Sequence, residues 1–181
     1  MSRSSSNVCR LNFATRYGNS SSPSEEYDPF RRTVAAPGMA TDRHAAVTWS
    51  GDLLHGKGTI DHVTSDAFGP LDVSWPSRTE EPNGRTSPEE LIAAAHASCY
   101  CMQLSHELAQ AGTPPEELSA SATVTFVPGT GITRSALTVV GRVPGADHAA
   151  FKAAAQAAKD GCPVSQALAG NVELSVDARL A

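Results

Sequence analysis

The sequence predicts an α+β fold in which antiparallel sheets accompany one long helix. Strand-like stretches with alternating apolar residues occur both before and after a helical segment at 88–111. A shorter helical segment and a last strand complete the chain, and this order of elements is typical of antiparallel sheets. The 181 residues are 40% hydrophobic, which is enough for one compact core.

Residues 1–40 precede this pattern and are rich in Ser, Arg, Asn and Pro. They lack periodicity at 2 or 3.6 residues, so we expect a disordered tail before a single domain at 41–181. The Arg- and Ser-rich start also suits a transit peptide, although it lacks an amphipathic apolar face. Met39 is an alternative start site.

Three short stretches, 44–51, 57–64 and 71–77, are separated by Gly, Asp and Pro and predict an N-terminal antiparallel sheet. The long helix then has a complete start signal, with Ser87 as N-cap, Pro88 at the first helical position and Glu90 closing a capping box. Gly112 ends it. Because residues 91–104 are apolar around most of the circumference, we expect a central, buried helix.

Two strands, at 119–127 and 132–143, follow the long helix. A second helix begins after Asp147 and stops at Gly161, and Cys162 and Pro163 open a short helical segment. The last strand, at 171–180, places its apolar residues inward: Val172, Leu174, Val176, Ala178 and Leu180.

The net charge of −5 excludes an overall positive field, so neither nucleic acid nor an anionic membrane is expected as a partner. No apolar run approaches the roughly 18 residues of a membrane span, and no secretory signal begins the chain. These observations predict a soluble, cytoplasmic protein.

Four cysteines, at 9, 99, 101 and 162, are too few for a disulfide-stapled scaffold, and the absence of a C-x-x-C pair argues against a zinc ribbon or a thioredoxin-type motif. Cys99 lies in the long helix. Cys162 begins a short one, where free amides favour a thiolate. A thiol peroxidase needs one thiolate that becomes sulfenic acid and a second thiol that traps it, and these two cysteines suit those roles.

Cys101 is the competing partner, but two residues along a helix turn its side chain by about 200° away from Cys99. His96 shares a face with Cys99, yet we expect a packed histidine rather than a base or a metal ligand. No metal, flavin, haem or other cofactor is expected.

The segments SPEELIAAAHASCYCMQLS and AKDGCPVSQAL, together with HGKGTI and VSWPSRTEE, resemble the OsmC branch of the OsmC/Ohr family of organic hydroperoxide reductases. The resemblance implies antiparallel sheets wrapped around a buried central helix in an intertwined homodimer. It also implies a peroxidase of oxidative and osmotic stress defence that reduces organic hydroperoxides, with hydrogen peroxide as a further candidate. A dithiol, such as a lipoyl-type protein, would be its reductant.

By this resemblance Cys99 is the peroxidatic thiol, Cys162 the resolving thiol, and Arg78 and Glu89 assist them; Arg85 is a rival for the arginine. Glu89 and Cys99 are ten residues apart on one helix. Their separation along its axis is therefore about 15 Å, too far for one site within one chain. We expect the active site to lie across a two-fold homodimer interface.

Two other functions stay open. A non-enzymatic redox-sensing dimer would form the disulfide without turnover. A hydrolase would use Cys99 with His96 as base, but it lacks a recognisable third group. Tyr100 places a hydroxyl where the family commonly has an apolar wall, and we expect it to alter the preference among peroxides.

Overall fold

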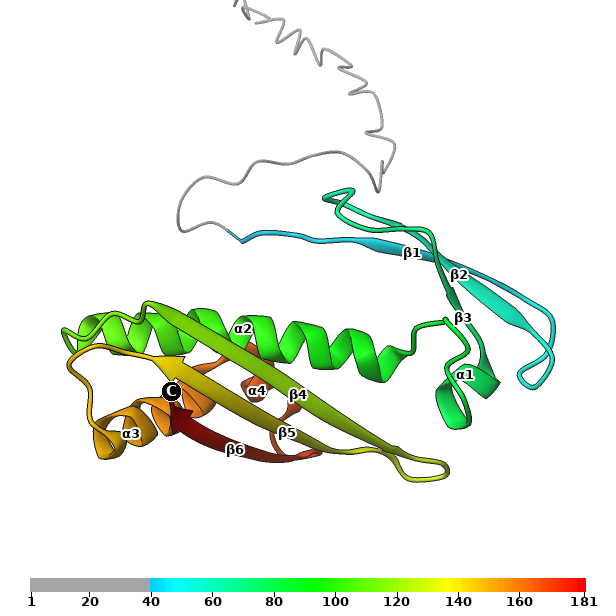
Figure 1. The fold of residues 1–181 in the computed structure, drawn as a ribbon. Coiled ribbons are helices and arrows are strands. Elements are labelled where there is room, and N and C mark those ends of the chain that lie inside the picture. Colours follow the sequence, from blue (N-terminus) through cyan, green and yellow to red (C-terminus); the bar gives the residue numbers. More distant parts are fainter. Residues whose placement is uncertain (1–39) are drawn as a thin grey trace, which may run out of the picture.

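The computed structural model describes residues 40–181, which form two three-stranded sheets and four helices (Figure 1). The strands are β1 (Ala45–Ser50), β2 (Lys57–Val63), β3 (Leu71–Val73), β4 (Glu117–Val127), β5 (Gly131–Arg142) and β6 (Glu173–Leu180). The helices are α1 (Trp75–Thr79), α2 (Pro88–Gln110), α3 (His148–Gly161) and α4 (Pro163–Leu168). The α+β prediction is confirmed. The expected tail, its cysteine and the alternative start at Met39 lie outside the described residues.

The N-terminal sheet has the order β1-β2-β3 with antiparallel pairs, as predicted. The prediction of a strand over 71–77 is wrong beyond residue 73, where α1 begins. Ser74 caps this helix, because its side chain accepts from the Ser77 amide and the Ser77 hydroxyl accepts from the Ser74 amide. Pro76 in the first turn suits a helix start better than a strand.

The long helix α2 begins where the sequence predicts. The Ser87 hydroxyl accepts a 3.2 Å hydrogen bond from the Glu90 amide, and the Glu90 carboxylate accepts one from the Ser87 amide. At the other end Gly112 takes a φ of 80°, and the Thr113 amide donates to the Leu108 carbonyl. These caps define a helix of 23 residues, long enough to separate sites at its two ends.

The C-terminal sheet has the order β4-β5-β6 and is only partly antiparallel. β4 and β5 form an antiparallel hairpin, whereas β6 runs parallel to β5. The expectation of antiparallel pairing throughout is therefore wrong for the last strand. The reason is the connection, since α3 and α4 carry the chain back to the end of the sheet at which β5 began.

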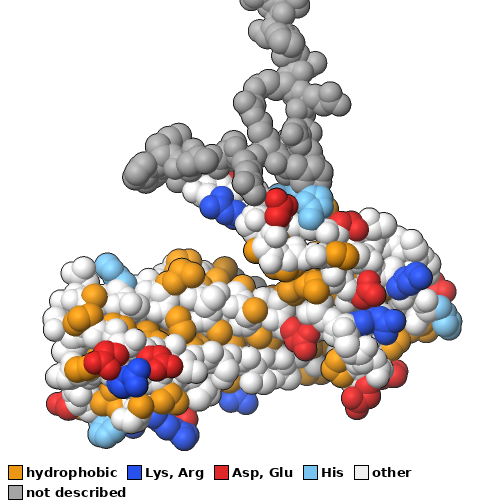
Figure 2. All heavy atoms as spheres, turned by 45° about the horizontal axis from the view of Figure 1, so that its top comes forward, with side chains coloured by type: hydrophobic (Ala, Val, Ile, Leu, Met, Phe, Trp, Pro, Cys, Tyr) orange, Lys and Arg blue, Asp and Glu red, His pale blue; other side chains and the backbone are white. Residues whose placement is uncertain are grey.

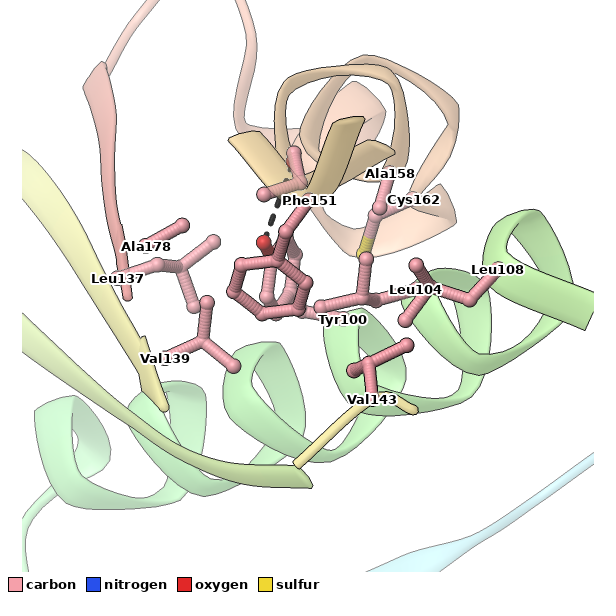
Figure 3. Packing of buried hydrophobic residues seen from close by; sticks show 11 residues of the cluster. Tyr100, Leu104, Leu108, Leu137, Val139, Val143, Phe151, Ala158, Cys162 and Ala178 are labelled. Carbon is pink, nitrogen blue, oxygen red and sulfur yellow. Dashed lines mark hydrogen bonds between the residues drawn. The ribbon is translucent and has the colours of Figure 1, made fainter. Parts of the chain in front are cut away.

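The core lies between this sheet and the helices α2, α3 and α4 (Figure 3). Tyr100, Leu104 and Leu108 recur every four residues and form one buried stripe of α2. Phe151 of α3 is fully buried against them and against β5. The core is completed by Leu137, Val139, Val143, Ala155, Ala158, Cys162 and Ala178.

Among residues 40–181 of one chain, other elements cover α2 on one face only. Met102 is 72% exposed, and Ala94, Ala95 and Ser98 are also exposed. Figure 2 shows hydrophobic side chains along the face of the molecule that α2 forms and on the N-terminal sheet next to it. Exposed apolar residues of the N-terminal part are Val47, Trp49, Leu53, Leu54 and Phe68. The described part of one chain therefore does not bury α2 on all sides.

Among the described residues there is no helix with the length and apolar character needed to cross a membrane.

Close packing at Gly141 gives a test of the core. A Cβ there would lie 2.6 Å from Cζ of the buried Phe151, so Gly141→Ala forces the ring or the strand to move. We expect a loss of about 1–3 kcal/mol in the free energy of unfolding, measured with urea. Gly161→Ala is the control, because the three atoms nearest to its Cβ would all belong to the flexible side chain of Gln103, at 3.1 Å or more. Equal stability of the two variants would contradict the packing described here.

Candidate active site

Two thiols meet where α2 crosses the start of α4. The Cys99 thiol lies close enough to the Cys162 thiol and to the Val164 backbone amide for both to influence its pKa. Cys162 is fully buried at the N-cap position of α4, whereas Cys99 is half-buried at the edge of the core. All three described cysteines are free thiols. The pair is thus reduced, adjacent and, through Cys99, reachable from the surface.

Burial is the main influence on the Cys99 thiol and raises its pKa above the ordinary value. The Val164 amide opposes this by donating a hydrogen bond, while the neighbouring Cys162 raises the pKa further. The free amide at the start of α4, which the sequence led us to assign to Cys162, therefore serves Cys99. Among residues 40–181, no cationic side chain contributes to the shift in the pKa of Cys99.

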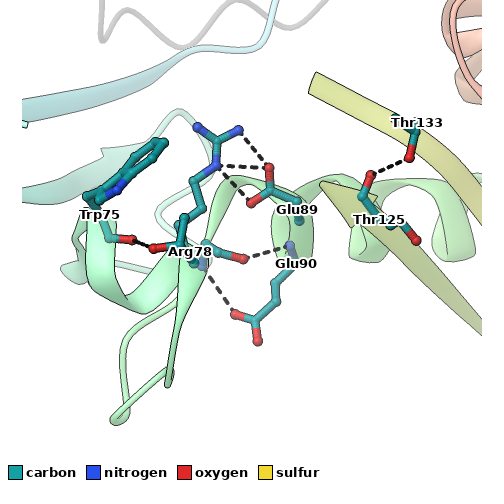
Figure 4. Close-up of polar contacts among 8 residues, drawn as sticks. Trp75, Arg78, Glu89, Glu90, Thr125 and Thr133 are labelled. Atoms are coloured by element: carbon teal, nitrogen blue, oxygen red, sulfur yellow. Dashed lines mark hydrogen bonds and ion pairs between the residues drawn. The ribbon is translucent and has the colours of Figure 1, made fainter. Parts of the chain in front are cut away.

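Arg78 and Glu89 form a largely buried ion pair at the start of α2 (Figure 4). The Arg78 Nη2 and Nε atoms donate to the Glu89 carboxylate at 2.7 and 3.0 Å. The side chains are 26% and 10% exposed, so water screens the pair only partly. Arg85, the rival candidate, is exposed. The expected pairing of a loop arginine with the glutamate after the helical proline is present in the structure.

An aromatic pair that sequence reasoning missed also holds this arginine. The Arg78 guanidinium carbon lies 3.9 Å from the ring centre of Phe126 and 5.8 Å from that of Trp75. The two rings meet edge to face, with their centres 6.2 Å apart. Phe126 lies near the end of β4, 48 residues after Arg78, so no local sequence signal joined them. Trp75 is three residues before Arg78. Recognising α1 in the sequence would have predicted that these two side chains share a helix face.

The four predicted site residues thus form two pairs, Arg78 with Glu89 and Cys99 with Cys162. The rise of α2 places Glu89 and Cys99 about 15 Å apart along its axis. Within one chain the structure does not bring the arginine to the thiol. The two pairs occupy different parts of the chain.

His96 is a packed histidine, as expected, and it is fully buried one turn before Cys99. Its Nδ1 lies 2.7 Å from the Ser135 hydroxyl and its Nε2 lies 2.9 Å from the Ser165 hydroxyl. Burial lowers the pKa of His96, so the ring is neutral near pH 7. Because both nitrogens are occupied by serines, His96 is not arranged to deprotonate Cys99.

Cys101 and Tyr100 face away from the thiol pair. Cys101 lies against the backbone of Ala120 in β4, which agrees with the expected rotation away from Cys99. Tyr100 points into the core and donates to the Ala155 carbonyl at 3.2 Å (Figure 3). The expectation that its hydroxyl affects peroxide preference is not supported by this placement, because the side chain is wholly buried. Helical rotation of about 100° per residue explains why neighbours of Cys99 turn elsewhere.

Among residues 40–181 no group of three or more His, Cys, Asp or Glu side chains is arranged to hold a metal ion.

The sequence matches the family model for OsmC-like proteins over residues 81–177, a segment that includes Glu89, Cys99 and Cys162. The peroxiredoxin OsmC of Escherichia coli strain K12 is 38% identical over 139 residues, which are 75% of this chain and 96% of that protein. The organic hydroperoxide resistance protein OhrB of Bacillus subtilis strain 168 is 26% identical over 122 residues, which are 66% of this chain and 90% of that protein.

Solved structures share the fold. The organic hydroperoxide resistance protein OsmC from Legionella pneumophila superposes with a TM-score of 0.56 at 21% identity, covering 76% of this chain and 97% of that one. The OhrB structure from Bacillus subtilis gives a TM-score of 0.55 at 23% identity, covering 75% and 97%. The arrangement of sheets and helices is therefore one that this group of proteins uses.

The neutral, buried His96 predicts a loss of stability in mild acid. Its pKa in the folded state is lowered from 6.5, so below about pH 6.5 the unfolded chain takes up a proton that the folded chain does not. The contribution of neutral His96 to the free energy of unfolding is fully present above this pH. Below it, the free energy of unfolding falls by up to about 1.4 kcal/mol per pH unit. Urea unfolding between pH 7.5 and 5.5 measures the slope.

The comparison is with His96→Gln, which keeps a donor and an acceptor but does not titrate. We expect a shallower dependence on pH for this variant. Identical slopes for the two proteins would mean that His96 is not held neutral in the folded state.

Proposed function

Because this chain belongs to the family of OsmC-like proteins, we propose that it is a thiol-dependent peroxidase that reduces hydroperoxides with Cys99 and Cys162. The observation that carries the proposal is the contact between the half-buried Cys99 thiol and the buried Cys162 thiol. The first is reachable by a substrate, and the second is protected from it. A peroxidatic and a resolving cysteine need that difference.

The first step is attack of the Cys99 thiolate on the terminal oxygen of the hydroperoxide. The S–O bond forms, the O–O bond breaks, and the leaving alkoxide takes a proton to become an alcohol. Cys99 is then a sulfenic acid. The Cys162 thiol attacks its sulfur, an S–S bond forms and water leaves. A dithiol must reopen the disulfide, and a lipoyl-type protein is the candidate that the family resemblance suggests.

A second copy of the chain would complete the site. Burial raises the pKa of Cys99, so the attacking thiolate needs a nearby positive charge, and residues 40–181 of one chain do not bring one to it. Arg78 supplies such a charge, but Glu89 holds it about 15 Å away along α2. The open face of α2 and the exposed apolar side chains of the N-terminal sheet favour a dimer that buries both. Arg78 of one chain would then serve Cys99 of the other.

The hydrolase alternative loses support because the His96 nitrogens are engaged by two serine hydroxyls. Turnover distinguishes the redox-sensing alternative from a peroxidase. A sensor forms one disulfide per chain and consumes no further peroxide.

Cysteine variants test the chemistry. With tert-butyl hydroperoxide and a lipoyl dithiol, we expect Cys99→Ser to lose all reaction and Cys162→Ser to consume peroxide once without turnover. Cys101→Ser, two residues from Cys99 but facing β4, is the matched control and should turn over as wild type does. Continued turnover in Cys99→Ser would refute the proposal. Disulfide formation without turnover by the wild type would favour the sensor.

Mixing two inactive variants tests the shared site. Arg78→Met lacks the cation and Cys99→Ser lacks the nucleophile, so each homodimer should be inactive. In a dimer of one of each, the intact Arg78 faces the intact Cys99 at one of the two sites. After subunit exchange an equal mixture should recover about a quarter of wild-type activity, because half of the dimers are mixed and each has one working site.

Refolding the two variants together provides the exchange, and refolding each alone is the control. No recovery in an exchanged mixture would mean that both groups act within one chain.

A further inference from the structure

Two contacts join α2 to the start of α4 at matching spacings. His96 and Cys99 are three residues apart on α2 and share a face. Cys162 and Ser165 are three residues apart where α4 begins. The His96 imidazole meets the Ser165 hydroxyl at 2.9 Å, and the Cys99 thiol meets the Cys162 thiol. The hydrogen bond and the thiol pair therefore lie side by side between the same two helices.

Only one of these contacts changes during the proposed reaction. The thiols pass through a sulfenic acid to a disulfide, whose sulfur atoms are about 2.05 Å apart. The imidazole and the hydroxyl take no part in that chemistry. They are also shielded, since His96 is 0% and Ser165 2% exposed. The thiol chemistry itself therefore does not consume this hydrogen bond.

Helix α4 depends on such a contact. It has six residues, too few to be stable alone, and no side chain caps its start. Its place is decided by packing against α2 and α3 and by the bond from Ser165 to His96. If α4 separates from α2, Cys162 leaves Cys99, because the cysteine is the residue directly before that helix.

We propose that His96 and Ser165 are positioning residues for resolution: their hydrogen bond keeps α4 on α2, so that Cys162 captures the Cys99 sulfenic acid before a second peroxide does. This inference rests on the two-cysteine peroxidase proposed above. The competing reaction is attack of the sulfenic acid on another hydroperoxide, which breaks its O–O bond and gives a sulfinic acid and an alcohol. The ratio of sulfinic acid to disulfide therefore measures how well α4 is held.

Ser135 provides a matched control on the same imidazole. Its hydroxyl is also fully buried and lies 2.7 Å from Nδ1 of His96. It belongs to β5 rather than to α4. Loss of either hydroxyl removes one buried hydrogen bond from His96, but only loss of the Ser165 hydroxyl releases α4.

The experiment compares full-length wild type with Ser165→Ala, Ser165→Thr and Ser135→Ala. Each reduced protein is treated with a series of tert-butyl hydroperoxide concentrations, and mass spectrometry measures Cys99 sulfinic acid against the Cys99–Cys162 disulfide. We expect Ser165→Ala to raise this ratio about five- to tenfold at matched peroxide, the scale expected for one buried hydrogen bond. Ser165→Thr, which keeps the hydroxyl, should restore the low ratio. Ser135→Ala should keep the wild-type ratio while losing thermal stability.

Equal ratios in Ser165→Ala and Ser135→Ala would overturn the inference, because the serines would then have only a structural role. If Ser165→Ala does not fold, Ser165→Val is compared with Ser165→Thr instead. These two side chains have the same shape, and only threonine carries the hydroxyl. If the wild type forms neither sulfenic acid nor disulfide, the peroxidase proposal fails and this inference fails with it. A wild type that forms the disulfide, together with unchanged ratios in the Ser165 variants, refutes the inference alone.

Discussion

The stiffness of α2 is the constraint on which the rest of the site depends. A regular helix rises by about 1.5 Å per residue, so Glu89 and Cys99 keep their separation in every state that leaves the helix intact. Glu89 in turn holds Arg78 by a bidentate ion pair, and Phe126 covers the guanidinium. The cation is therefore fixed at the start of the helix, and the thiol is fixed near its middle. This distance is the physical reason for proposing a site made by two chains.

The two faces of α2 have different roles. One face is packed into the core through Tyr100, Leu104 and Leu108, and its polar groups are satisfied. Among residues 40–181, no buried side-chain nitrogen or oxygen lacks a hydrogen-bond partner. The other face carries small or flexible residues and is open in the single chain. Cys99 lies at the boundary, where its sulfur contacts the core but is not enclosed by it.

Burial alone would make Cys99 a poor nucleophile, since it raises the pKa of the thiol. The Val164 amide partly compensates within the chain, and it belongs to the same short helix that carries Cys162. In the proposed reaction, helix α4 would contribute both to the stability of the Cys99 thiolate and to the position of Cys162 as resolving thiol. The buried hydrogen bond between His96 and Ser165 joins α4 to α2. Both proposed contributions of α4 would therefore depend on it.

By itself, the sequence determined the local features. Ser87, Pro88 and Glu90 predicted the start of α2, and the same kind of signal at Ser74 would have revealed α1. Helical periodicity also predicted that Cys101 faces away from Cys99, because that depends only on residues close in the chain. The ten-residue spacing of Glu89 and Cys99 on one helix also predicted that their side chains lie about 15 Å apart along its axis.

Only the tertiary structure decided the contacts between distant segments. The parallel pairing of β6 follows from the path of α3 and α4, which the strand's own residues do not encode. The partnership of Arg78 with Phe126 and of His96 with Ser135 and Ser165 joins residues 39 to 69 positions apart. No periodicity or capping rule reaches across such a separation, because these pairs form only when the whole core closes around them.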